Sequence, residues 1–147
     1  MFGDRFPRAG RPLLIKGAKP VGFDSVLPLS VDVLIGADGR IADFGASIAA
    51  GEDAKVIDAG GRWLSPGWAD LHVHVWYGGT DISLRPEQCG AARGVTTMVD
   101  AGSAGEANFH GFREFIIEPA KENIYAFLNL GSIGLVACNR MSELIDM

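Results

Sequence analysis

After Pro66 the sequence alternates short apolar segments with segments of helical pattern, and this alternation limits the folds open to the chain. Pro86 suits the first turn of one helix, and Gly94 suits its C-terminal cap. A second helical segment covers residues 106–122. Three apolar, β-branched segments are predicted as strands: residues 69–76, 95–100 and 124–130. Strand, helix, strand, helix, strand predicts an α/β fold with parallel βαβ units.

The second helical segment has one apolar face, made by Phe109, Phe112 and Ile116. His110 falls outside that set, on the polar side of the helix or near its first turn. We therefore do not expect His110 to bind a metal.

Residues 13–65 have a different texture, with short Val-, Ile- and Leu-rich segments bounded by Gly, Asp or Pro. Asp38-Gly39 predicts a hairpin with a type I′ turn, because Gly supplies the positive φ that this turn needs. Residues 17–30 are expected to be a loop. The predicted organisation is a disordered tail (1–12), a β-rich segment (13–65) and the first units of a βα domain (66–147).

The composition is that of an ordinary soluble globular protein, with 48% hydrophobic and 21% charged residues. The net charge of −5, without a cluster of Lys and Arg, argues against nucleic acid or an anionic membrane as a partner. Cys89 and Cys138 are far apart and form no CxxC motif, so a disulfide framework is not expected. The expected location is the cytoplasm.

Two histidines stand one residue apart in the first strand of the alternating region, in the segment PGWADLHVHVWYGG. In a strand, Asp70, His72, His74 and Trp76 share one face. Side chains two residues apart on one face have Cβ atoms about 6–7 Å apart. Two imidazoles that reach inward from there can converge on one cation.

Two roles are open for Asp70, and two for the histidine pair. Asp70 could accept a ring N–H and so orient a ligand, or it could bond a neighbouring backbone group. His72 and His74 could bind a metal, or they could be buried, hydrogen-bonded histidines without one, because a bare HxH motif is weak.

Other polar residues also lie where the predicted strands end, which is where parallel sheets carry their functional groups. Asp100 could orient a ligand or cap the following loop. Ser103 in AGSAG has the placement of a nucleophile elbow, but Ala101 stands where that motif has Gly, so a loop serine is the simpler interpretation. Asn129 is similarly ambiguous.

The order of motifs resembles the beginning of an amidohydrolase-superfamily enzyme. The segments that carry the resemblance are DGRIADFG, VIDAGGRWLSPGWADLHVHV and AARGVTTMVD. The stretch VDAGSAG with NFHGF further resembles the deacetylase branch, which is grouped with dihydroorotases and D-aminoacylases.

This resemblance implies a small β-sandwich domain that leads into a (β/α)₈ TIM barrel, of which the chain has about the first three βα units. It implies a hydrolase with one or two divalent ions, usually zinc, in which a metal-activated water attacks an amide or ester. His72 and His74 match the first-strand metal ligands, with Asp70 behind them. The turn after the second strand faces the active site in this family, which places Ser103 on the substrate side. Asn129, near the end of the third strand, is a second candidate for that side.

The family takes its other ligands from later strands: a carboxylated lysine or acidic residue, two more histidines and a catalytic aspartate. None can be matched in this sequence, so we expect an N-terminal fragment without a catalytic residue of its own, inactive in isolation. Its expected partners are an acylated small-molecule substrate and the missing C-terminal part of the barrel, or a second copy of the chain.

Two alternatives to the deacetylase interpretation remain. A dihydroorotase-like hydrolase of cyclic amides would use the same metals, but dihydroorotases tend to have Met-Pro-Asn where this chain has Ala101, Gly102 and Ser103. A metal-free, non-catalytic fragment or pseudo-enzyme is an alternative of another class.

Overall fold

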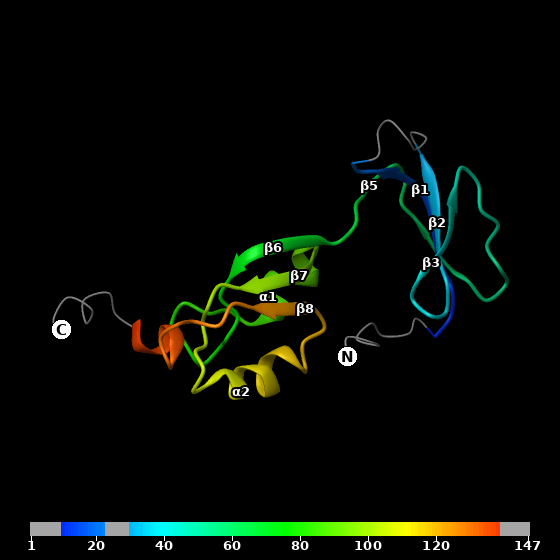
Figure 1. The fold of residues 1–147 in the computed structure, drawn as a ribbon. Coiled ribbons are helices and arrows are strands. Elements are labelled where there is room, and N and C mark those ends of the chain that lie inside the picture. Colours follow the sequence, from blue (N-terminus) through cyan, green and yellow to red (C-terminus); the bar gives the residue numbers. More distant parts are fainter. Residues whose placement is uncertain (1–9, 23–29, 139–147) are drawn as a thin grey trace. The chain divides into compact units, whose positions relative to one another are not determined.

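The computed structural model describes residues 10–22 and 30–138 and forms two compact units that meet between Pro66 and Gly67. Figure 1 shows the strands of each unit. Of the predicted tail (1–12), residues 1–9 lie outside the described residues. Within the described ranges, no helix is long and apolar enough to cross a membrane.

The first unit is a five-stranded sheet, as the β-rich pattern predicted. In space the order is β3-β2-β1-β4, and β5 pairs with the end of β1. The β1–β2 and β2–β3 pairs are antiparallel, whereas β4 and β5 run parallel to β1. The strands are β1 (Leu13–Pro20), β2 (Val31–Ile35), β3 (Ile41–Gly45), β4 (Lys55–Asp58) and β5 (Trp63–Leu64).

Strand β1 continues to Pro20, so the predicted loop over residues 17–30 was placed too early. The backbone N–H of Lys19 donates to the carbonyl of Arg62, and that of Val21 donates to the carbonyl of Leu64, both at 2.9 Å. These partners lie in β5 and directly before it, more than 40 residues along the chain. Pairing with a distant strand overrides the local turn signal. Residues 23–29 of the predicted loop lie outside the described residues.

The hairpin predicted at Asp38-Gly39 is present, but its turn differs from the prediction. The N–H of Gly39 donates to the carbonyl of Gly36 at 2.9 Å, and the N–H of Gly36 donates to the carbonyl of Arg40 at 2.8 Å. These bonds close a three-residue loop in which Gly39 has a φ of 78°. The loop therefore has the pattern of a type I turn followed by a left-handed glycine, not a two-residue type I′ turn.

Asp32, on β2, stabilises a register shift in the neighbouring strand β1. The register of β1 shifts between Ile15 and Ala18, where Gly17 adopts a φ of 64°. The buried carboxylate of Asp32 accepts the N–H of Gly17 at 2.8 Å and the N–H of Ile48 at 3.1 Å. The bond from Ile48, then that from Gly17 and the charge of Lys16, hold the pKa of Asp32 below its ordinary value against the opposing effect of burial.

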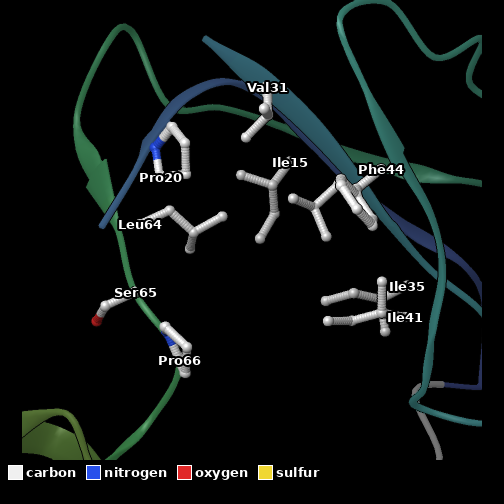
Figure 2. A pocket seen from close by; sticks show the side chains of 10 residues that line it. Ile15, Pro20, Val31, Ile35, Ile41, Phe44, Leu64, Ser65 and Pro66 are labelled. Atoms are coloured by element: carbon white, nitrogen blue, oxygen red, sulfur yellow. The ribbon is translucent and has the colours of Figure 1, made fainter. Parts of the chain in front are cut away.

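One face of this sheet forms an apolar groove of about 490 Å³. Figure 2 shows Ile35 and Ile41 side by side in it, as expected from their pairing across β2 and β3. Ile41 and Phe44 remain more than half exposed. The groove is lined by Ile15, Pro20, Val31, Val33, Ile35, Ile41, Phe44, Leu64, Ser65 and Pro66.

The second unit is built on a three-stranded sheet in the order β6-β7-β8, with both pairs parallel. The predicted parallel arrangement is confirmed. Strands β6 (Trp68–Val73) and β8 (Asn123–Ala126) end three and four residues earlier than predicted, whereas β7 (Val95–Asp100) has the predicted bounds. Val73 and Ala126 both pair with Asp100, the last residue of β7. All three strands therefore end at the same level of the sheet.

The first predicted helix forms with an interruption. Pro86 occupies its first turn in α1 (Pro86–Cys89), and Gly94, with a φ of 82°, caps the following 3₁₀ turn η1 (Ala91–Arg93), as predicted. The break lies at Gly90, beside the buried carboxylate of Glu122, which accepts the N–H of Ala91 at 3.0 Å. A contact from a residue 31 positions away therefore divides the helix.

The second helix changes geometry along its length, and this changes which residues it buries. α2 (Phe109–Phe112) is followed by a π-helical turn, η2 (Arg113–Ile117). Because a π-helix bonds residues five apart, Phe112 and Ile117 are both buried, whereas Ile116 is only partly buried. Together they cover Val75, Met98, Ala104 and Ile124. A last 3₁₀ turn is η3 (Gly134–Cys138).

Replacement of Phe112 by alanine tests this core. Phe112 is fully buried, so Phe112→Ala is expected to lower the free energy of unfolding by about 3–5 kcal/mol. Phe115, on the same helix, is 70% exposed, and Phe115→Ala is the matched control, expected to change stability by about 0.5 kcal/mol or less. Urea titration at low protein concentration measures both. Equal effects of the two variants would contradict the described packing.

Asp32 predicts an acid-dependent loss of stability. A lowered carboxyl pKa stabilises the fold above the unfolded-state value of about 3.9, and this contribution is lost as pH falls through the lower folded-state value. Asp32→Asn is therefore expected to destabilise the first unit at neutral pH, with a difference from wild type that shrinks in strong acid. Urea midpoints across pH measure it. Asp43→Asn, at an exposed position of β3, should leave the profile unchanged.

Candidate metal centre

His72 and His74 lie at the carboxyl end of β6, and their rings are neighbours. His72 is within the strand and His74 directly follows it. The ring centroids are 5.6 Å apart, with the planes at 80°. Two imidazoles that bind one zinc ion at about 2.0–2.1 Å each have centroids roughly 5 Å apart, so the observed separation fits a shared cation. His72 is exposed, whereas His74 is partly buried.

Asp70 makes the second of the two contacts predicted for it. Its Oδ1 accepts the backbone N–H of His72 at 3.0 Å, a local bond between residues two apart. The carboxylate therefore supports the strand that carries the histidines, while its predicted role behind a metal stays a prediction.

The ring of His74 bonds to a different residue, Ser103. Nδ1 of His74 lies 3.0 Å from Oγ of Ser103, and this hydroxyl donates to Oδ2 of Asp100 at 2.8 Å. Both Ser103 and Asp100 are completely buried. Because the Ser103 hydroxyl is buried and committed to these two partners, it is not placed as an exposed elbow nucleophile.

Asp100 caps the loop after β7 and also accepts a hydrogen bond from the segment that follows β6. Oδ1 accepts the N–H of Ser103 at 2.7 Å, and Oδ2 also accepts the N–H of Val75 at 2.9 Å. The N–H of Ala101 donates to the carbonyl of Val73, also at 2.9 Å. The loop-capping role that the sequence left open for Asp100 is thus observed, whereas its role in orienting a metal ligand stays a prediction.

Asn129 connects the loops that follow β7 and β8. Its side-chain amide donates to the carbonyl of Gly102 at 3.0 Å, and its Oδ1 accepts the N–H of Gly131 at 2.8 Å. Gly105 lies so close to the backbone of Gly131 that a Cβ atom there would clash. Asn129 therefore orders this edge of the site, and its predicted contact with substrate remains a prediction.

His110 takes the place expected from the sequence, and Cys89 lies in the first helix of the second unit. His110 is the second residue of α2 and is exposed. Cys89 is a free, partly buried thiol that packs against the core. Burial raises the pKa of Cys89, and the nearby carboxylates of Asp70, Glu122 and Glu87 add to this effect. A raised pKa disfavours the thiolate and thus metal binding by Cys89.

Known proteins with similar sequences and structures point to one superfamily. The chain is 65% identical over 137 residues to a protein from Agrobacterium fabrum named a deacetylase, covering 92% of this chain and 34% of the relative. A crystal structure titled as a dihydroorotase matches with a TM-score of 0.77 and 62% identity, covering 88% of this chain and 34% of the other. A scan against models of known families finds no match.

The chain is homologous to the N-terminal third of amidohydrolase-superfamily proteins. A more distant relative, a protein from Geobacter named dihydroorotase, is 31% identical over 128 residues and is covered over 29% of its length. The chain thus spans about a third of the length of the relatives that it matches. The sequence prediction of this superfamily, and of its N-terminal portion, is confirmed.

The described part of this amidohydrolase homologue supplies two nitrogen donors to the candidate centre. Within residues 10–22 and 30–138, no group of three or more His, Cys, Asp or Glu side chains is placed to hold a metal. A catalytic zinc site normally has three protein ligands and an open position for water. His72 and His74 fit the first part of such a site, and further donors would have to come from elsewhere.

The sequence indicated each member of the candidate site but not the connection between them. Asp100 and Ser103 are three residues apart in one turn, a spacing typical of a side chain that caps its own loop. Ser103 and His74 are 29 residues apart, and only the parallel pairing of β6 with β7 brings them together.

The two aspartates of the site are expected to differ strongly in their effect on stability. Asp100→Ala would leave the N–H groups of Val75 and Ser103 without their buried acceptor, at a cost of about 3 kcal/mol or more. Asp70→Ala removes one bond at a more exposed position and should cost about 1 kcal/mol. Urea or thermal unfolding compares the two, and a larger effect at Asp70 would contradict this description.

Proposed function

We propose that the chain forms the first part of the active site of a metal-dependent amidohydrolase that cleaves an N-acyl amide or a related ester with a metal-activated water. The observation that carries the proposal is the adjacent pair of imidazole rings, His72 and His74, at the carboxyl end of the first strand of a parallel sheet. The 65% identity to a protein named a deacetylase supports the acyl-amide substrate class.

Zinc is the proposed metal, because imidazole nitrogen is one of its preferred ligands. When bound, zinc lowers the pKa of a coordinated water to about 7 and so supplies a nucleophile at neutral pH. In this chain His72 and His74 would hold the ion, and Asp70 would support the backbone of His72.

A dihydroorotase-like hydrolase of cyclic amides is the second candidate, because the solved structure with 62% identity carries that title. The turn after β7 favours the acyl-amide class, since Ala101, Gly102 and Ser103 stand where Met-Pro-Asn is expected in dihydroorotases.

The remaining ligands and the catalytic aspartate are proposed to come from residues outside this chain, the missing C-terminal part of a barrel. Exposed apolar side chains support this proposal. The groove of the first unit, where Ile41 is 68% exposed, is a contiguous apolar surface, which is a common mark of an interface. In the second unit, Leu71 on β6 is 71% exposed. The proposed location is the cytoplasm, in line with the free thiol of Cys89.

Metal content and substrate preference test the proposed function, measured on this chain together with the proposed C-terminal part of the barrel. We expect near-stoichiometric zinc by elemental analysis, and hydrolysis of N-acetylated amino acids in preference to dihydroorotate. Loss of one nitrogen ligand should remove most of the metal, so His72→Ala and His74→Ala are each expected to abolish turnover.

His110→Ala is the matched control, because His110 is exposed on α2 and makes no part of the pair. It should retain wild-type metal content and activity. A folded wild-type protein that contains no zinc would overturn the metal proposal. Preferential hydrolysis of dihydroorotate would support the second candidate instead.

A further inference from the structure

We propose that Ser103 and Asp100 fix the tautomer of His74, so that its ring carries the proton on Nδ1 and presents the lone pair of Nε2. Ser103 and Asp100 are positioning residues in this scheme. Their effect on metal binding rests on the proposed function, whereas the tautomer itself does not.

The first step is the direction of the hydrogen bond between Ser103 and Asp100. The Asp100 carboxylate receives three donors: the N–H groups of Val75 and Ser103 and the Ser103 hydroxyl. A carboxylate can only accept, so the single proton of the hydroxyl points to Oδ2 of Asp100. Two backbone donors hold the carboxylate in place from both strand ends.

The second step follows at the histidine. The Ser103 hydroxyl donates its only hydrogen bond to Asp100. Toward Nδ1 of His74, its oxygen can therefore only accept. The 3.0 Å contact is then a hydrogen bond only if Nδ1 carries the proton. In a neutral imidazole, the other nitrogen, Nε2, keeps its lone pair, which is the form that binds a metal.

Burial makes this arrangement selective. Ser103 and Asp100 are both completely buried, so water does not compete for their hydrogen bonds. In the opposite tautomer, Nδ1 and the Ser103 oxygen would face each other as two acceptors. His72 differs, because the contact with Asp70 involves its backbone N–H and not its ring. Ser103 and Asp100 therefore orient the ring of His74 and not that of His72.

Selective ¹⁵N labelling of histidine tests the proposal on the intact, metal-free protein. Under conditions where the ring is neutral, His74 should show a protonated, pyrrole-type Nδ1 and a pyridine-type Nε2. Its signals are assigned by their loss in His74→Gln. In Ser103→Ala, Nδ1–H loses its acceptor, so the Nε2–H form should appear and zinc affinity should fall about 10–100-fold. Ser103→Thr retains the hydroxyl and should restore the wild-type tautomer.

Ser83→Ala is the matched control, since Ser83 is also a buried serine of the second unit but bonds to Thr80. It should leave the His74 signals and zinc affinity unchanged. A wild-type His74 protonated on Nε2, or an unchanged tautomer in folded Ser103→Ala, would overturn the positioning proposal. Absence of zinc from a wild-type protein that keeps Nδ1–H would instead overturn the proposed function while upholding the tautomer.

Discussion

The buried carboxylate of Asp100 connects the fold of the second unit to its candidate site. It lies at the last position of β7, where it accepts the N–H of Val75 from beyond the end of β6 and the N–H of Ser103 from its own loop. A buried acceptor that satisfies backbone donors just beyond two strand ends holds the segments after those strands together. The same carboxylate orients the Ser103 hydroxyl toward His74, so the strand ends and the histidine ring share one support.

The two units differ in how far the apolar surface of their sheets is covered. In the second unit, Phe112 and Ile117 cover the sheet from one side, aided by the π-helical turn that brings both inward. In the first unit the groove stays open, with Phe44 54% exposed. Small β-sheets gain stability from burying one face, so the open groove leaves apolar surface of the first unit exposed to solvent.

Much of the fold could be predicted because the relevant signals are local. The bounds of β7, the start of α1 at Pro86 and the cap at Gly94 follow from side-chain periodicity and backbone preference. Three of the errors share a different cause. The end of β6, the extension of β1 to Pro20 and the break at Gly90 each depend on a partner more than 20 residues away. Local sequence patterns do not indicate contacts with residues that are distant along the chain.

In the candidate site, too, the local features could be predicted from the sequence, whereas the contact between distant residues could not. The sequence by itself indicated that His72 and His74 lie on the same side of one extended segment, because a period of two places residues two apart on the same face. It also marked Asp100 and Ser103 as residues of one turn. Only the tertiary structure decided that this turn meets the ring of His74, because the contact exists only once β6 and β7 pair in parallel and end at the same level.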